Sequence, residues 1–169
     1  MSPLFKAMVP LREWERLMVR RYLALKHKSC RCAEVGVRDG YNADRIIELC
    51  LPKRLFLVDI WDEQWRYDLV MQRFSRPDVT VLRGDSVRMA QTIEPHTLDW
   101  VYIDGDHSYD GCLRDLLAWS DCVRAGGSIA GDDYAFPAVR AAVREACRVN
   151  RGLRPVWRWR QFILKADGR

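Results

Sequence analysis

Residues 98–109 read LDWVYIDGDHSY, residues 126–134 read GGSIAGDDY, and these two stretches decide the fold. Each contains a short apolar run, too short for a helix, that ends abruptly in carboxylates. Between the two runs the apolar residues follow helical spacing, at Cys112, Leu116, Trp119 and Val123. The order is therefore strand, helix, strand, which is the repeating unit of a parallel sheet.

Four carboxylates are expected to meet at one edge of this sheet. Parallel strands end at the same edge, so Asp104 and Asp106 should lie beside Asp132 and Asp133. Ligands of open α/β sheets bind at that edge. Converging carboxylates repel one another unless a cation lies between them, and a hard divalent ion is the usual solution. The pattern predicts an active site here.

The rest of the chain extends the same alternation. Apolar residues at helical spacing, Leu11, Trp14, Met18, Tyr22 and Leu25, predict an amphipathic helix that covers one face of the sheet, with Trp14 and Tyr22 in the core. Strands are expected over 32–37, 55–60 and 79–82, and helices over 63–74, from 86 to about 93 and over 136–149. Asn42 is a candidate N-cap for the helix that follows the first strand.

The end of the chain differs from the βα pattern. Residues 155–160 and 161–166 are two adjoining strand segments with almost nothing between them. They must form an antiparallel hairpin or one bent strand. We therefore predict a single doubly wound α/β domain over 1–169, with a covering helix in 1–29 and the core in 30–166.

Composition narrows the class of protein. No apolar run approaches the roughly 20 residues that span a bilayer, and residues 1–10 lack a signal-peptide layout. The six cysteines are scattered, and Cys30 and Cys32 have no second Cys/His pair at zinc spacing. We expect reduced thiols and a cytoplasmic protein that contacts no membrane.

The turn after the first strand carries a candidate cofactor site. Gly36 and Gly40 would let the backbone approach a ligand, although a tight turn alone would also need glycine. Asp59 ends the next strand, where an acid can accept both ribose hydroxyls of a nucleoside. Glu34, within an apolar strand, needs a partner such as a cationic amino group or a water. Asp85 is either a helix N-cap or an adenine contact.

These motifs together carry a resemblance. The turn from Glu34 to Gly40, Asp59, the segment 84–86 and the two carboxylate-ended strands resemble a class I S-adenosylmethionine-dependent methyltransferase over residues 30–165. The likeness is to the small bacterial group related to macrocin-type and catechol-type metal-dependent O-methyltransferases. It implies a Rossmann-like seven-stranded sheet, mostly parallel, with a reversed last strand.

The resemblance also assigns residues. It implies cofactor-binding roles for Glu34, Gly36, Gly40, Asp59, Asp85 and Asp104. It implies Mg²⁺, or another divalent cation, on Asp104, Asp132 and Asp133. The alternative for Asp132 and Asp133 is that they are only turn residues.

The implied chemistry is methyl transfer to a hydroxyl group. A metal-bound hydroxyl is acidified and aligned with the methyl group, which makes Asp104 part of the catalytic set. His107 is the best candidate general base, because imidazole titrates near neutral pH; alternatively it caps or orients the following helix. Asp106 either supports the site from behind or hydrogen-bonds Ser108.

The C-terminal part of the chain is basic. From residue 138 onward the net charge is +7, whereas the rest of the chain carries −2. Trp157 and Trp159 alternate with Arg158 and Arg160. The simplest expectation is that the indoles pack on the helix layer and the arginines face water. The alternative is a surface for an anionic acceptor, such as a phosphorylated sugar, a carrier-bound intermediate or RNA.

We therefore predict a methyltransferase whose partner is a small hydroxylated molecule, a sugar or natural product, with S-adenosylmethionine and Mg²⁺ as cofactors. A homodimer could supply the walls of the acceptor site that so short a chain lacks. One rival is a metal-independent methyltransferase of RNA or another polyanion, with steep salt dependence. A second is a relative that binds the cofactor without turnover, or a hydroxylase-like one.

Overall fold

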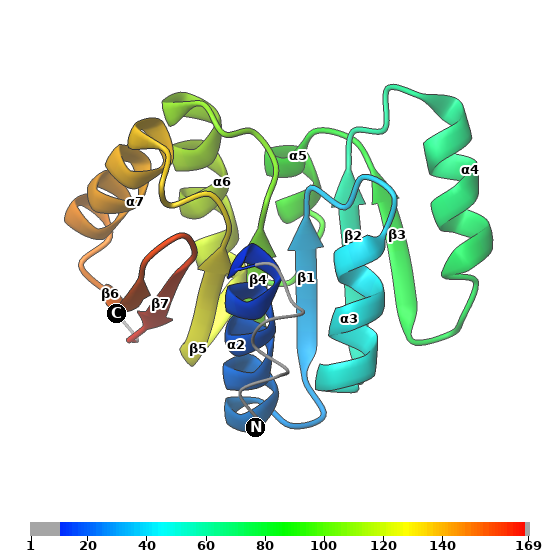
Figure 1. Ribbon diagram of the computed structural model, residues 1–169, viewed down its shortest axis with the longest axis horizontal. Coiled ribbons are helices and arrows are strands. Elements are labelled where there is room, and N and C mark those ends of the chain that lie inside the picture. The colour runs from blue at the N-terminus through cyan, green and yellow to red at the C-terminus, as the bar shows by residue number, and fades with distance from the viewer. Residues whose placement is uncertain (1–10, 168–169) are drawn as a thin grey trace.

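The computed structural model describes residues 11–167, and Figure 1 shows their arrangement. In chain order the elements are α2 (Leu11–Lys26), β1 (Arg31–Val35), α3 (Tyr41–Cys50), β2 (Arg54–Asp59), α4 (Gln64–Arg73), β3 (Val79–Arg83), α5 (Ser86–Ala90), β4 (Leu98–Ile103), α6 (Tyr109–Cys122), β5 (Val123–Gly131), α7 (Pro137–Val149), β6 (Leu153–Arg158) and β7 (Phe162–Ala166). The predicted alternation of strands and helices is confirmed, with boundaries shifted by a few residues.

The seven strands form one sheet in the order β3-β2-β1-β4-β5-β7-β6. Strands β1 to β5 pair in parallel, whereas β7 runs antiparallel to both β5 and β6. The two C-terminal segments are thus a hairpin and not one bent strand. The predicted seven-stranded, mostly parallel sheet with a reversed last strand is confirmed.

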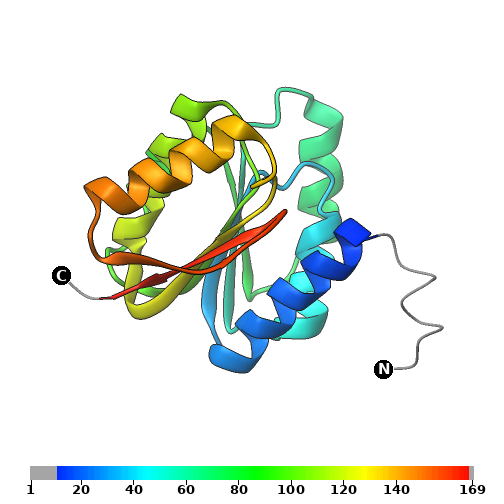
Figure 2. The same cartoon turned by 60° about the vertical axis from the view of Figure 1, so that its left-hand side comes forward.

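Helices cover both faces of the sheet, as the turned view in Figure 2 makes clear. On one face α2, α3 and α4 bury residues such as Leu23, Ile46 and Val70 against the strands. On the other face α5, α6 and α7 bury Ala90, Trp119 and Val143, among others. Each strand between two helix layers is apolar on both faces, which explains the near-continuous hydrophobic runs in the sequence.

Helix α2 lies on the sheet with a different face from the one that the periodicity predicts. Val19 and Leu23 are fully buried, whereas Leu25 is 78% exposed. Tyr22 packs against the core but stays partly accessible, and Trp14 is also only partly buried. The prediction that Leu25 belongs to the buried face of α2 was therefore wrong. Two polar residues, Glu15 and Arg20, are buried in this helix instead.

The start of α3 also departs from the prediction. Gly40, with φ of 81°, is the N-cap, and the helix begins at Tyr41. Asn42 lies inside the first turn and is buried, so its assignment as N-cap was wrong. Its side chain is used elsewhere, in hydrogen bonds to Arg20 and Glu34.

Two further expectations concern membrane-spanning helices and the state of the cysteines. Among the helices of residues 11–167, none combines the length and apolar character needed to cross a membrane. All six cysteines are free thiols, and the sulfur atoms of Cys30 and Cys32 lie 3.9 Å apart in the interior.

Candidate active site

The site forms where the strand order of the sheet reverses, between β1 and β4. The chain builds outward from β1 to β2 and β3 on one side, and from β4 to β5 on the other. Just past the strand ends, the amide of Asp104 donates to the carbonyl of Val35 at 2.8 Å, and that of Asp132 donates to Ile103 at 3.1 Å. The strand-end carboxylates therefore meet at one edge, as predicted, at the usual ligand position of such sheets.

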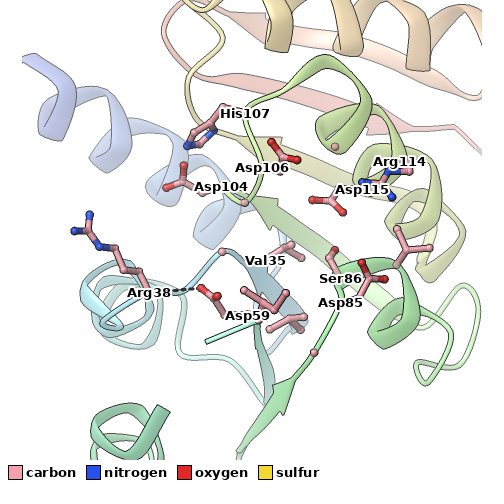
Figure 3. Close-up of a pocket in the computed structure, with 17 residues that line it drawn as sticks. Val35, Arg38, Asp59, Asp85, Ser86, Asp104, Asp106, His107, Arg114 and Asp115 are labelled. Atoms are coloured by element: carbon pink, nitrogen blue, oxygen red, sulfur yellow. Dashed lines mark hydrogen bonds between the residues drawn. The ribbon is translucent and has the colours of Figure 1, made fainter. Parts of the chain in front are cut away.

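Two adjoining cavities open at this edge. The larger, of about 470 Å³, is shown in Figure 3 and contains six of the residues singled out from the sequence: Gly36, Asp59, Asp85, Asp104, Asp106 and His107. The smaller, of about 350 Å³, shares Gly36, Asp104 and His107 with the first and adds Arg16, Glu34, Asn42 and Asp133. Together the two cavities have room for a nucleoside and a second group.

Position 36 requires a glycine because of its backbone conformation and its close packing. Its φ is 85°, a conformation that glycine adopts without strain. A Cβ atom here would lie 2.2 Å from the carbonyl oxygen of Asp104. The absence of a side chain thus lets the turn after β1 pack directly on the end of β4, with both bordering the two cavities.

Asp59 anchors the floor of the larger cavity. One of its carboxylate oxygens accepts from the amide of Arg38 at 2.7 Å, and the other accepts from the amide of Trp61 at 3.2 Å. These bonds tie the turn after β1 to the end of β2.

Gly40 has a different position from Gly36: it lines neither cavity, and a Cβ there would lie 2.3 Å from the Phe74 ring.

Asp85 serves as the N-cap of α5, because its side chain accepts from the amide of Arg88 at 3.0 Å. The predicted role of Asp85 as a helix N-cap is confirmed. Asp85 also lines the larger cavity. Beside it, Figure 3 shows Asp115 directed from α6 toward the same end of the cavity. Asp115 is buried, and burial raises its pKa to about 6.

Glu34 lies in the wall of the smaller cavity, in the middle of the buried sheet. Asn42 Nδ2 donates to one of its oxygens at 3.0 Å, and the other oxygen has no partner among the described residues. Burial raises the pKa of Glu34 to about 8, although the Asn42 hydrogen bond acts in the opposite direction. A buried acid with an oxygen still to satisfy suits a cationic or donor group on a ligand.

The two neighbouring aspartates after β5 turn in different directions. Asp133 has φ of 56°, a left-handed conformation that aspartate tolerates better than most residues. The Asp132 carboxylate, only 1% exposed, binds the guanidinium of Arg16, with Nε at 2.8 Å. The same guanidinium binds Asp104, with Nη2 at 3.3 Å from Oδ2. Asp132 therefore faces α2 and its arginine.

Asp133 instead faces His107. The distance from His107 Nε2 to Asp133 Oδ2 is 3.5 Å. Ligand atoms of Asp104, His107 and Asp133 all lie within 4.8 Å of one another, and Asp132 is not a member of this group. The three carboxylates that the resemblance assigns to one metal ion are thus split between two cationic or ionisable partners, Arg16 and His107.

The loop between β4 and α6 holds His107 in place. Ser108, and not His107, caps α6, since its hydroxyl accepts from the amide of Gly111 at 3.0 Å. Asp106 accepts from the amide of Ser108 at 2.8 Å, which confirms the Ser108 bond that the sequence analysis considers for it. The His107 ring lies 6.2 Å from that of Phe136 and is 43% exposed on its side chain. An accessible imidazole thus stands at the mouth of both cavities.

The comparison with protein families decides the class. A family model described as a methyltransferase domain matches residues 33–134, which is more than half of the chain. The chain belongs to this family. It is an S-adenosylmethionine-dependent methyltransferase, and the hydroxylase-like alternative is set aside.

Solved structures support the fold of this methyltransferase. NodS, an N-methyltransferase of Bradyrhizobium japonicum WM9, superposes with a TM-score of 0.67 at 13% identity, over 92% of this chain and 97% of that one. A Corynebacterium glutamicum protein gives 0.71 at 15% identity, over 97% and 86%. Spermidine synthase from Thermotoga maritima gives 0.63 at 13% identity, over 89% and 59%.

Likeness at these identities shows the fold alone, and spermidine synthase carries the name of a different enzyme. No curated protein sequence matches the chain. The acceptor of the methyltransferase must therefore be argued from its own site.

Two site residues escaped the sequence analysis. Arg16 was missed because Glu13 lies three residues before it and Arg20 four residues after it. This spacing is typical of charged side chains that form ion pairs on the exposed face of a helix. Asp115 could have been found, because it lies three residues after Cys112 and four before Trp119, on the apolar face of α6. A carboxylate on such a face is a signal of a buried polar site.

The basic C-terminal strands also differ from expectation. Trp159 is 65% exposed and Trp157 is 39% exposed, so the prediction that both indoles pack on the helix layer was wrong. Trp157 lies in β6, an edge strand with a neighbour on only one side, and Trp159 lies just past its end, in the connection to β7. Arg158 and Arg160 face water as expected. The carbonyl of Arg160 accepts from the amide of Tyr134 at 2.7 Å, which places the hairpin tip beside the Asp133 loop.

Proposed function

We propose that this methyltransferase transfers the methyl group of S-adenosylmethionine to a hydroxyl group of a small acceptor, such as a sugar or a natural product. The observation that carries this proposal is the His107–Asp133 pair, 3.5 Å apart, at the junction of the two cavities. A neutral imidazole supported by a carboxylate is suited to removing a proton from a hydroxyl group.

The larger cavity suits the nucleoside part of the cofactor. Asp59 keeps acceptor capacity on both oxygens after its two amide bonds, which fits a ribose diol. Asp85 and Asp115 offer acceptors to an adenine amino group at the opposite end. The smaller cavity, with Glu34 and Asp104, suits the cationic amino group of the methionyl part.

When bound, the cofactor supplies an electrophilic methyl group. The acceptor oxygen forms the new bond to carbon as the bond from carbon to sulfur breaks. The hydroxyl proton passes to His107, and with Nε2 directed at Asp133, Nδ1 is the nitrogen that receives it. Asp133 stabilises the imidazolium that results. The partly exposed ring of Phe136 supplies an apolar wall beside the base.

The proposal has no metal-dependent step. The family resemblance implies Mg²⁺ on Asp104, Asp132 and Asp133, but Asp132 and Asp104 both bind the Arg16 guanidinium in this arrangement. The remaining convergent group contains the imidazole of His107, whereas Mg²⁺ prefers oxygen ligands in octahedral geometry. These residues do not fit Mg²⁺ as they stand.

The test is a methyl-transfer assay with methyl-labelled S-adenosylmethionine and a panel of sugars, phosphorylated sugars and phenols. We expect acceptor-dependent release of S-adenosylhomocysteine with the label on an oxygen atom. His107→Ala should lower kcat by ~10²–10⁴-fold while the Kd of the cofactor changes little. His96→Ala, an exposed histidine away from both cavities, is the matched control. Label found on nitrogen, or an unchanged kcat in His107→Ala, would contradict the proposal.

A second candidate is an anionic acceptor of larger size, including RNA. The exposed indoles of Trp157 and Trp159 beside Arg158 and Arg160 favour it, because aromatic and cationic side chains together bind nucleic acids and other polyanions. It predicts that acceptor binding falls steeply with salt and that Arg158→Ala/Arg160→Ala reduces the salt slope. A flat salt dependence leaves the small-molecule proposal in place.

A further inference from the structure

The guanidinium of Arg16 lies among three carboxylates at the active-site edge. Its Nε and Nη2 bind Asp132, its Nη2 also lies 3.3 Å from Oδ2 of Asp104, and its Nη1 lies 3.2 Å from Oε1 of Glu13. The side chain of Arg16 is only 15% exposed, although it starts from a helix that covers the sheet. It therefore reaches inward, to the point where the strands end.

A buried carboxylate at Asp132 needs a positive partner. Taking an ionised carboxyl group out of water is costly unless a cation and hydrogen bonds replace the water. Arg16 supplies both, because its planar group donates to one carboxylate oxygen through two nitrogen atoms. Burial alone lowers the pKa of Arg16, but Asp132, Tyr102 and Asp104 raise it by more, so the group stays charged.

We propose that Arg16 is the resident cation of this acidic edge and takes the position, between Asp104 and Asp132, that a divalent metal ion would otherwise occupy. The methyltransferase would then neutralise its strand-end carboxylates with its own side chain. A metal ion at the same oxygens would have to displace the guanidinium or lie beside it at strongly unfavourable Coulomb energy.

The group formed by Asp104, His107 and Asp133 does not offer a separate place for the ion. Asp104 belongs to both arrangements, since it also accepts from Arg16. Any ion held by Asp104 is therefore a close neighbour of the guanidinium. The inference consequently covers the whole acidic edge, and it does not depend on which acceptor the enzyme methylates.

The test measures metal binding directly. Mn²⁺ is titrated into wild type, Arg16→Ala and Arg16→Lys, and bound ion is followed by electron paramagnetic resonance. Arg21→Ala, which removes an exposed arginine from the same helix, is the matched control. We expect weak, non-saturable binding to wild type, Arg16→Lys and Arg21→Ala. Arg16→Ala should bind Mn²⁺ at least ~10-fold more tightly, because Asp104 and Asp132 then lose the guanidinium that neutralises them. Adding Asp132→Asn to Arg16→Ala should abolish the gain.

Two further measurements, on proteins that retain Arg16, test the inference even if Arg16→Ala does not fold. Saturable binding of one Mn²⁺ per chain that Asp132→Asn or Asp133→Asn removes would overturn the inference. Cofactor affinity that falls ~10-fold or more when EDTA replaces Mg²⁺ would overturn it as well. These readouts need no methyl acceptor, so they stand apart from failure of the proposed O-methylation.

Discussion

Asn42 Nδ2 donates a hydrogen bond of 3.0 Å to Glu34, and this bond joins the first turn of α3 to the interior of β1. Asn42 in turn accepts from Arg20 of α2. A buried network thus connects the helix that covers the sheet with the acid in the wall of the smaller cavity. The bond satisfies only one oxygen of Glu34, and burial keeps its pKa near 8.

This burial predicts a pH dependence of stability. Because the pKa of Glu34 is raised by folding, its contribution is complete below about pH 4.5 and is lost as pH rises toward about 8. Glu34→Gln cannot ionise and should lack that loss. Chemical denaturation between pH 5 and 8.5, with the exposed Glu48→Gln as control, measures the difference. Equal slopes in wild type and Glu34→Gln would contradict the prediction.

Asp59→Ala should weaken cofactor binding by ~10–100-fold, since charged hydrogen bonds contribute roughly 1.5–3 kcal/mol. The variant loses a carboxylate at the cavity floor and frees the amides of Arg38 and Trp61. Calorimetric titration of S-adenosylmethionine measures the effect. Glu48→Ala removes an exposed acid that lines neither cavity and should bind like wild type. A Kd within twofold of wild type for Asp59→Ala would remove Asp59 from the site.

Gly36→Ala tests the close approach of two loops. Gly126→Ala is the control: Gly126 has a similar positive φ, of 76°, but the atom nearest to an added Cβ is the flexible end of the Arg124 side chain, at 3.6 Å. That control should cost ~1–2 kcal/mol of unfolding free energy from conformation alone. Gly36→Ala should cost a further ~1–3 kcal/mol, because its Cβ meets the Asp104 carbonyl at 2.2 Å. Equal losses in the two variants would show that the contact relaxes freely.

Asp115→Asn tests the buried acid that lines the larger cavity. Because the pKa of Asp115 is raised to about 6, mainly by burial, wild type should bind the cofactor more tightly as pH rises from 5 to 7. An ionised carboxylate accepts hydrogen bonds from the ligand better than a protonated one. Asp115→Asn should lose this trend. The Kd of S-adenosylmethionine across this range is the measurement, and a trend that persists in the variant would assign it to another group.

Much of the architecture follows from the sequence alone. Short apolar runs that alternate with helical periodicity can be satisfied only by a parallel sheet with helices on both faces. Parallel pairing then places the last residue of each strand, or the residue after it, at one edge, so a common edge for Asp59, Asp104 and Asp132 follows from the sequence. The lack of residues for a crossover connection left two alternatives at the C-terminus, an antiparallel hairpin or one bent strand, and the pairing of β6 with β7 decided between them.

Only the tertiary structure decided what these carboxylates face. Arg16 is 116 positions from Asp132, and nothing in the local pattern of α2 distinguishes an arginine that points into the site from one in water. The left-handed conformation of Asp133 sends two consecutive aspartates to different partners, Arg16 and His107. The exposure of Trp157 depends on β6 forming the edge of the sheet. Periodicity reports local chemistry, whereas the choice of counter-ion depends on contacts between distant elements.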